Sequence, residues 1–297
     1  MNELILFLNN QDVEFKCDVS LKEYSSIKIG GIASVIAFPD SFNKLKILID
    51  FLEEKRTKYR VVGRMTNLLP SDSGYDGVII ITRKINSYSY ENNRLTCDCG
   101  ATFSKIIRNM AKFGIGGFES LYGIPGSVGG MVYSNAGAYG CEISDFLIKA
   151  KVYLIKEKLQ TVFDNSDFKF AYRDSILKKG GIILLDTVFR THEKSKENIL
   201  LELGKIKERR LHTQPIDKPS VGSVFKRTEL GPASLLIDKA GMKGISVGGA
   251  QISKKHAGFI INKGNATSVD FFNLTELVKE QIKIKYSFVL EEEFEKL

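Results

Sequence analysis

The stretch GIPGSVGGMVYSNAGAYG, residues 123–140, constrains the fold of this chain more than any other feature. It contains six glycines and no charged residue. Glycine loosens regular structure, so this density is tolerated where bare backbone must approach something closely. Backbone N–H groups in such loops can surround phosphate oxygens. The stretch therefore predicts an anion site built from main chain rather than from charged side chains.

Neither of the two common phosphate-binding patterns is present. The P-loop pattern G-x-x-x-x-G-K-[ST] is absent, and GIGGFE at residues 114–119 ends in glutamate where the dinucleotide-binding pattern has its third glycine. A second candidate loop, GRMTNLL at residues 63–69, follows a predicted strand. Tight turns alone could explain either loop, but the two together favour a long ligand with two phosphates.

Composition indicates a globular protein and argues against several partners. The chain has 297 residues, of which 43% are hydrophobic and 26% charged, and a net charge of +8. The densest basic stretch, KIKERR at residues 205–210, contains its own glutamate and no aromatic residue, which predicts a solvated helix face and no nucleic-acid partner. No segment predicts a signal peptide or a membrane span. The four cysteines are Cys17, Cys97, Cys99 and Cys141. Cys97 and Cys99 lie two apart on a predicted strand without metal-ligand spacing, so we expect no metal site and buried free thiols there, in a reducing cytoplasm.

Hydrophobic periodicity predicts a mixed α/β (α+β) protein in three blocks, residues 1–83, 84–213 and 214–297. The last boundary rests on the proline-bearing linker QPIDKPS. Helices are predicted at residues 39–55, 102–114, 196–213, 232–241 and 267–286. Strands are predicted at residues 32–38, 59–63, 78–82, 94–100, 146–155, 181–191, 245–252, 256–264 and 287–294.

Six motifs occur in order along the chain. They are YSSIKIGGIA, GIPGSVGGMVYSNAGAYG, YRDS, KPSVGSVFK, GGAQISKKHAGFIIN and LEEEF. In these motifs the chain resembles the UDP-N-acetylenolpyruvoylglucosamine reductase (UDP-N-acetylmuramate dehydrogenase) family of bacterial cell-wall synthesis. The resemblance extends from about Tyr24 to Phe294, in a shorter form that lacks a tyrosine-bearing loop of the larger members.

The resemblance implies a vanillyl-alcohol-oxidase-type FAD-binding domain made of the first two blocks, followed by a C-terminal α/β substrate domain. FAD would lie between the first two blocks. The implied cofactor-binding residues are Gly63, Thr66, Asn67, Leu68, Gly123, Ile124, Pro125, Gly126, Ser127, Gly129, Gly130, Ala136 and Gly137. The first loop departs from the family pattern G-x-G-S-N, because Met65 replaces the second glycine and Thr66 the serine.

The resemblance also implies the reaction. NADPH would reduce FAD, and the hydride would pass to C3 of the enolpyruvyl group, so that C2 gains carbanion character and needs a proton. The implied catalytic residues are Ser223 as proton donor, Arg173 for the carboxylate, and Glu293. The implied substrate-binding residues are Lys226, Arg227, Lys243, Gln251 and His256. Arg227 and Thr228 stand where the family has Asn-Pro.

Strand alternation in residues 287–294 predicts that Phe288, Leu290 and Phe294 form an apolar face, with Glu293 on the opposite face. Glu292 is expected to be a solvated acidic side chain. Two rival functions stay open at this point: another FAD oxidoreductase of the same fold, and a non-catalytic nucleotide- or RNA-binding protein. The sequence does not determine the oligomeric state, for which a monomer is the expectation, or the preference for NADPH over NADH.

Overall fold

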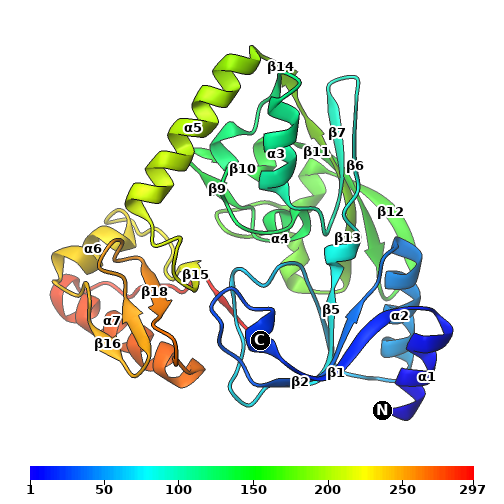
Figure 1. Ribbon diagram of the computed structural model, residues 1–297, viewed down its shortest axis with the longest axis horizontal. Helices are drawn as coiled ribbons and strands as arrows, with labels where there is room; N and C mark the ends of the chain where they lie inside the picture. The colour runs from blue at the N-terminus through cyan, green and yellow to red at the C-terminus, as the bar shows by residue number, and fades with distance from the viewer. The chain divides into compact units, whose positions relative to one another are not determined.

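The structure is a computed structural model that describes residues 1–297, and the chain forms two compact units (Figure 1). Unit 1 comprises residues 1–17, 35–64 and 77–208, and unit 2 comprises residues 18–34, 65–76 and 209–297. Each unit is therefore assembled from segments far apart in the sequence. The division at residues 83 and 213 stays a prediction.

The helices are α1 (Asn2–Asn10), α2 (Phe42–Glu54), α3 (Phe103–Ala111), α4 (Val128–Tyr133), α5 (Lys196–Thr213), α6 (Ala233–Lys239) and α7 (Ser268–Tyr286). The strands are β1 (Glu14–Ser20), β2 (Ile32–Phe38), β3 (Tyr59–Val62), β4 (Leu68–Leu69), β5 (Tyr75–Ile81), β6 (Tyr88–Glu91), β7 (Arg94–Asp98), β8 (Ile115–Gly116), β9 (Gly137–Ala138), β10 (Cys141–Glu142), β11 (Leu147–Leu154), β12 (Leu159–Asp164), β13 (Ile182–Arg190), β14 (His192–Glu193), β15 (Ser220–Ser223), β16 (Ser246–Val247), β17 (Ala250–Ile252), β18 (Phe259–Asn262) and β19 (Glu295–Lys296). No helix is both long and apolar enough to cross a membrane.

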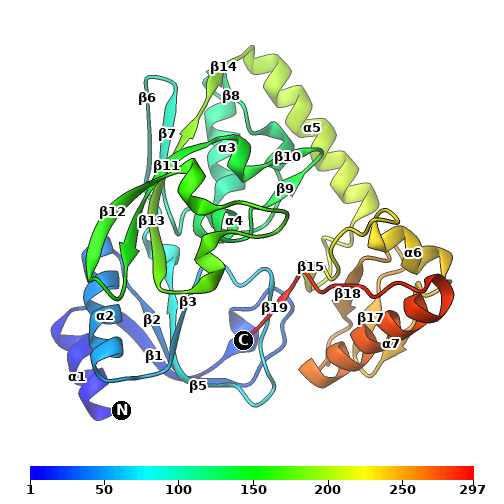
Figure 2. The ribbon, with the colours of Figure 1, turned by 180° about the vertical axis from the view of Figure 1, so that it is seen from behind.

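A five-stranded antiparallel sheet is the centre of unit 1, with strand order β12-β11-β13-β7-β6 (Figure 2). Its inward side chains, such as Leu95 and Cys97 of β7, are fully buried because alternate residues of a strand face the same side. Burial raises the pKa of the Cys97 thiol, and it raises that of Cys99 to about 12, so neither thiol ionises at neutral pH. The prediction of buried free thiols is confirmed for these two cysteines.

Four phenylalanine rings hold α3 against this sheet. Phe103 of α3 lies 5.4 Å from Phe118 and 5.3 Å from Phe189 of β13, measured between ring centroids. Phe118 also meets Phe146 edge to face at 5.5 Å. Such tilted and edge-to-face pairs are favourable beyond their buried area. They fix the segment that immediately precedes the glycine-rich stretch.

Unit 2 contains a four-stranded sheet of order β15-β18-β17-β16, with α7 packed on β16 and β17 (Figure 2). The predicted apolar stripe of α7 is confirmed, since Phe271, Leu274, Val278 and Ile282 are all buried. The predicted capping box is also present: Thr267 Oγ1 accepts the N–H of Asp270, and the Asp270 carboxylate accepts the N–H of Thr267.

The prediction of a regular strand over residues 287–294 is wrong. Ser287 adopts φ +54 at the end of α7, which turns the chain. The segment then makes only a bridge between Phe225 and Glu292 before β19 pairs in parallel with β4. The predicted burial survives, because Leu290 and Phe294 are buried in the core of unit 2. Two different backbone partners, rather than one ladder, therefore fix this segment.

The prediction that Glu292 is solvated is also wrong. Its carboxylate accepts a hydrogen bond from Lys279 Nζ at 2.5 Å and is only 18% exposed. Burial alone would lower the pKa of Lys279, but hydrogen bonds to Glu276 and Glu292 outweigh burial and raise it. Strand alternation could not predict this pairing, because the partner, Lys279, lies on α7, 13 residues earlier in the chain.

Asn262 is a buried polar residue of unit 2 whose side chain makes four hydrogen bonds to backbone groups. Its Nδ2 donates to the carbonyls of Ile27 and Lys28, and its Oδ1 accepts the N–H groups of Gly264 and Ala266. The side chain thus joins the segment near residue 27 to the end of β18.

We expect Asn262→Ala to destabilise the protein by roughly 3 kcal/mol, because it leaves several buried backbone groups without partners. Chemical denaturation followed by circular dichroism measures this. Asn265→Ala, at an exposed neighbouring position, is the control and should change stability little. Equal midpoints for the two variants would contradict the account.

Candidate functional site

The glycine-rich stretch begins with a tightly docked loop and a short helix that the sequence did not predict. Ser127 caps α4, its Oγ accepting the N–H of Gly130 at 3.2 Å. The next two N–H groups pair with other segments: Val128 donates to Ala101 and Gly129 to Cys99. The loop is therefore held in place by backbone hydrogen bonds to the segment that precedes α3.

Two backbone donors in this loop stay unused. Neither the N–H of Gly126 nor that of Ser127 donates a hydrogen bond within the protein, although both residues are buried. Gly126 adopts φ +150, which side-chain-bearing residues rarely reach. Adjacent N–H groups without a partner in the protein are consistent with the anion site that the sequence predicts here, which stays a prediction.

Gly63 lies directly against this loop. A Cβ atom on Gly63 would come within 2.0 Å of Ser127 Oγ, so glycine is required there for close packing. The structure therefore brings together Gly63 and Ser127 from two loops that the sequence treated separately.

Two residues that sequence reasoning missed support the loop. Ser104 Oγ accepts the N–H of Gly123 and donates to the carbonyl of Ile124. Glu119, which is buried, accepts hydrogen bonds from Gly117 N–H and Lys194 Nζ. Burial alone would raise the pKa of Glu119, but these hydrogen bonds and its own backbone N–H hold it below the ordinary value. Neither residue carries a sequence signal beyond lying near glycines.

The second half of the stretch approaches Arg173. Nη2 of Arg173 donates to the carbonyl of Gly137 at 3.0 Å. Ala136, immediately before it, is buried. Ala136 and Gly137, predicted to bind the cofactor, and Arg173, predicted to be catalytic, thus lie together in unit 1.

In unit 2, Met65 has a left-handed backbone conformation, which favours glycine. It adopts φ +51 and is buried. Ser26 Oγ lies within hydrogen-bond distance of the carbonyls of Met65 and Thr66, and it donates to Ser220 at 2.7 Å. The loop of Thr66, Asn67 and Leu68 is therefore tied to β15, which carries Ser223.

Ser223 and Glu293 lie on neighbouring backbone segments of unit 2. The pairing of β15 with β18 shifts register between Ser220 and Ser223, and Gly222 adopts φ +87. Such irregularities redirect side chains next to active sites. Glu293 N–H donates to Val224, directly after Ser223, and its carbonyl accepts from Asn67 Nδ2 at 3.0 Å.

The predicted substrate-binding side chains are engaged in local contacts. Lys226 pairs with Glu291 at 3.1 Å, and Lys243 with Asp238 at 2.5 Å. Gln251 Nε2 donates to Gly244 and Ser246. Arg227, the remaining cation of the set, follows Lys226 directly in the chain.

His256 is neutral and has a defined tautomer. Its Nδ1 accepts the N–H of Gly258, so the ring proton is on Nε2. Burial, together with the charge of Lys243, lowers the pKa of His256 below its ordinary value. This ring can therefore donate from Nε2 at neutral pH.

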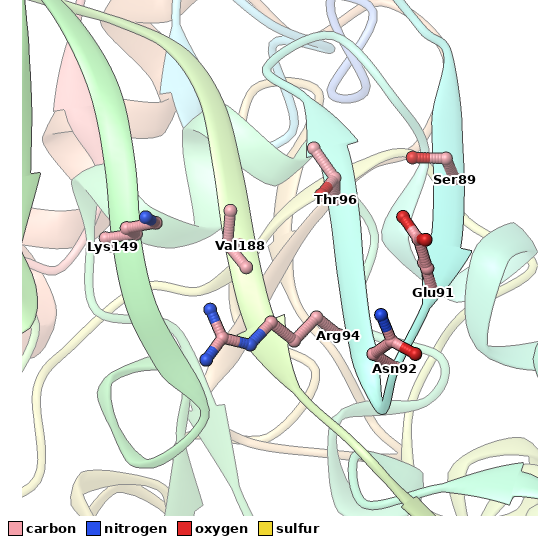
Figure 3. A pocket seen from close by; sticks show the side chains of 7 residues that line it. All are labelled: Ser89, Glu91, Asn92, Arg94, Thr96, Lys149 and Val188. Atoms are coloured by element: carbon pink, nitrogen blue, oxygen red, sulfur yellow. The ribbon is translucent and has the colours of Figure 1, made fainter.

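A shallow hollow of about 480 Å³ lies elsewhere, on the open face of the five-stranded sheet (Figure 3). It is lined by Ser89, Glu91, Asn92, Arg94, Thr96, Lys149 and Val188. No predicted site residue is among them, so the hollow has no part in the candidate site.

Comparisons with known proteins agree with this geometry. A family model described as "FAD binding domain" matches residues 33–162. A second, described as "UDP-N-acetylenolpyruvoylglucosamine reductase, C-terminal domain", matches residues 214–297. The first covers Gly63 and the glycine-rich stretch, and the second covers Ser223 and Glu293.

Relatives match almost the whole chain. UDP-N-acetylenolpyruvoylglucosamine reductase of Caldicellulosiruptor bescii is 41% identical over 296 residues, covering 99% of this chain and 94% of its own. The reductase of Lactobacillus acidophilus is 36% identical over 289 residues, covering 97% of each chain.

Solved structures give the same result. The crystal structure of UDP-N-acetylenolpyruvylglucosamine reductase from Thermus caldophilus superposes with a TM-score of 0.81 at 30% identity, covering 96% of this chain and 98% of its own. Cholesterol oxidase from Brevibacterium sterolicum matches with a TM-score of 0.50 at 13% identity, over 61% of this chain and 38% of its own, which is a likeness of fold alone. The predicted vanillyl-alcohol-oxidase-type FAD fold is confirmed, and so is FAD as the cofactor.

We expect Gly126→Asp to purify with much less FAD than Gly126→Asn. The two side chains have the same size and meet the same backbone strain at φ +150, but only the carboxylate repels a pyrophosphate. Flavin absorbance per protein chain measures the difference. Equal flavin content in the two variants would show that this loop does not face the phosphates.

Proposed function

Because the chain belongs to the UDP-N-acetylenolpyruvoylglucosamine reductase family, we propose that it reduces UDP-N-acetylenolpyruvoylglucosamine to UDP-N-acetylmuramate in bacterial peptidoglycan precursor synthesis. It is an FAD-dependent oxidoreductase, with NADPH as the hydride donor. The observation that supports the residue assignments is the backbone pairing of Glu293 with Val224, the residue after Ser223, and with the Asn67 side chain.

FAD supplies the redox chemistry when bound, taking a hydride from NADPH and delivering it to the substrate. The chain's own part is to hold and orient the cofactor. The N–H groups of Gly126 and Ser127 are proposed to bind its pyrophosphate, with Gly63 packed behind them. The proposed cofactor-binding set is Gly63, Thr66, Asn67, Leu68, Gly123, Ile124, Pro125, Gly126, Ser127, Gly129, Gly130, Ala136 and Gly137.

Ser223 is proposed to give a proton to C2 of the substrate. A serine hydroxyl is a weak acid, but a centre with carbanion character is basic enough to take its proton. In the structure, Ser223 Oγ donates to the carbonyl of Phe225 at 3.2 Å, so the chain just after β15 holds the hydroxyl. Lys226 and Arg227 follow closely and stabilise developing negative charge on the oxygen.

Arg173 is proposed to bind the substrate carboxylate. A guanidinium offers several N–H donors in a planar fork, which matches a carboxylate. Negative charge on that carboxylate grows as hydride reaches C3, so the contact strengthens in the transition state.

Glu293 is proposed to act as the second acid–base group. Its backbone is fixed on both sides, because its N–H donates to Val224 and its carbonyl accepts from Asn67. Lys226, Arg227, Lys243, Gln251 and His256 are proposed to bind the nucleotide-sugar part of the substrate. A cytoplasmic monomer is proposed, in keeping with four free cysteines in a reducing compartment.

Ser223→Ala should separate the two half-reactions. Flavin reduction by NADPH should stay near normal, because no proton reaches C2 in that step. Flavin reoxidation by the enolpyruvyl substrate should slow by roughly two to four orders of magnitude, the usual worth of general acid catalysis. Anaerobic stopped-flow absorbance measures each half. An equal loss in both halves would assign Ser223 a structural role instead.

Glu293→Gln should keep folding and flavin content intact but slow flavin reoxidation by substrate severely. The substitution preserves shape and removes charge and acidity. Glu280→Gln, at an exposed position of α7, is the matched control and should have no effect. Glu292 does not serve as a control because of its ion pair with Lys279. Similar mild effects at Glu293 and Glu280 would remove Glu293 from the proposed machinery.

A further inference from the structure

Arg173 occupies a backbone conformation that disfavours arginine. It is the third residue of a tight turn in which Ala171 and Asp174 exchange backbone hydrogen bonds of 3.2 and 3.1 Å. Arg173 has φ +55 at a position that favours glycine or asparagine. A left-handed conformation is unfavourable for a residue with a side chain, so other contacts must hold this turn.

Asn135 supplies one of those contacts and is itself fully engaged. It is buried and adopts φ +41. Its Nδ2 donates to the carbonyl of Ala171 at 3.0 Å and to Glu142 Oε2 at 2.7 Å, while its Oδ1 accepts the N–H of Ser144. The turn that carries Arg173 is thereby linked to Glu142.

Glu142 contacts the guanidinium through its other oxygen. Oε1 lies 3.8 Å from Arg173 Nη1. The guanidinium makes two further contacts. Its Nη2 donates to the carbonyl of Gly137, and its Cζ lies over the ring of Tyr172, 4.9 Å from the ring centroid. A Cβ on Gly137 would come within 2.8 Å of Glu142 Cγ, so only glycine at this position leaves room for the Glu142 side chain.

We propose that Glu142 is a positioning residue for Arg173, one carboxylate oxygen orienting the guanidinium and the other fixing the turn through Asn135. The role rests on the proposed function, in which Arg173 binds the substrate carboxylate. An ion pair whose two side chains are 18% and 33% exposed restrains orientation more than it stabilises the fold. Its loss therefore affects the step that uses the guanidinium.

The test is a double-mutant cycle on the flavin-loaded enzyme, with Glu142→Gln, Arg173→Ala and the pair. Glu142→Gln keeps an oxygen that can accept from Asn135 but removes the charge that faces Arg173. Each protein is reduced with NADPH under anaerobic conditions, and flavin reoxidation is followed against the concentration of the enolpyruvyl substrate. Glu157→Gln, exposed in the turn between β11 and β12, is the control.

We expect Glu142→Gln to slow reoxidation at low substrate roughly three- to tenfold, within the lower part of the range of coupling between contacting residues, and to leave reduction by NADPH unchanged. In the Arg173→Ala background the same substitution should have almost no effect, because the group it orients is gone. A merely structural role would instead reduce both half-reactions and the flavin content in either background.

Two results would count against the proposal, and they differ. If the wild-type enzyme is active, but Glu142→Gln slows reoxidation by the same factor in the wild-type and the Arg173→Ala backgrounds, only the role of Glu142 is overturned. A wild-type protein whose reduced flavin is not reoxidised by the enolpyruvyl substrate overturns the proposed function, and the positioning role with it.

Discussion

The glycine-rich loop depends on main-chain donors that have no partner in the protein: Gly126 and Ser127 are buried residues, and neither N–H donates a hydrogen bond to another group of the chain. Leaving such groups unpaired costs roughly 1–3 kcal/mol each, so other contacts must hold the loop in shape. The capping of α4 by Ser127, the two hydrogen bonds of Ser104 and the pairing of Glu119 with Lys194 do this. This explains why the loop needs no charged side chain: backbone N–H dipoles that are held in place can bind a pyrophosphate through short contacts.

The segment that carries Glu293 is held by backbone pairing of a different kind. In unit 2 the segment at residues 290–297 pairs first with the chain after Ser223 and then with β4. Glu293 sits between these two pairings, while Phe294 beside it is buried against Phe271. The same short segment therefore anchors the apolar core and presents a carboxylate, so Glu293 needs no long loop to be held.

Hydrophobic periodicity correctly predicted the elements that depend on local sequence, such as helices and their caps. The stripe of α7, its Thr267–Asp270 cap and the helix of residues 196–213 are all present. The glycine-rich stretch indicated an anion site, but helix α4 inside it escaped prediction because Gly129 and Gly130 argue against a helix locally. The strand at residues 287–294 failed because the left-handed Ser287 and two distant backbone partners decide its path. Contacts such as Ser26 to Ser220 or Glu142 to Arg173 join residues that no sequence pattern relates.

Transfer of a hydride from NADPH through the flavin to an enolpyruvyl nucleotide sugar can be followed directly in a single turnover. The purified yellow protein is bleached anaerobically with one equivalent of NADPH, UDP-N-acetylenolpyruvoylglucosamine is added, and flavin absorbance is followed. The account predicts rapid and complete return of the oxidised flavin, with UDP-N-acetylmuramate formed in equal amount. A flavin that stays bleached after the substrate is added would contradict it.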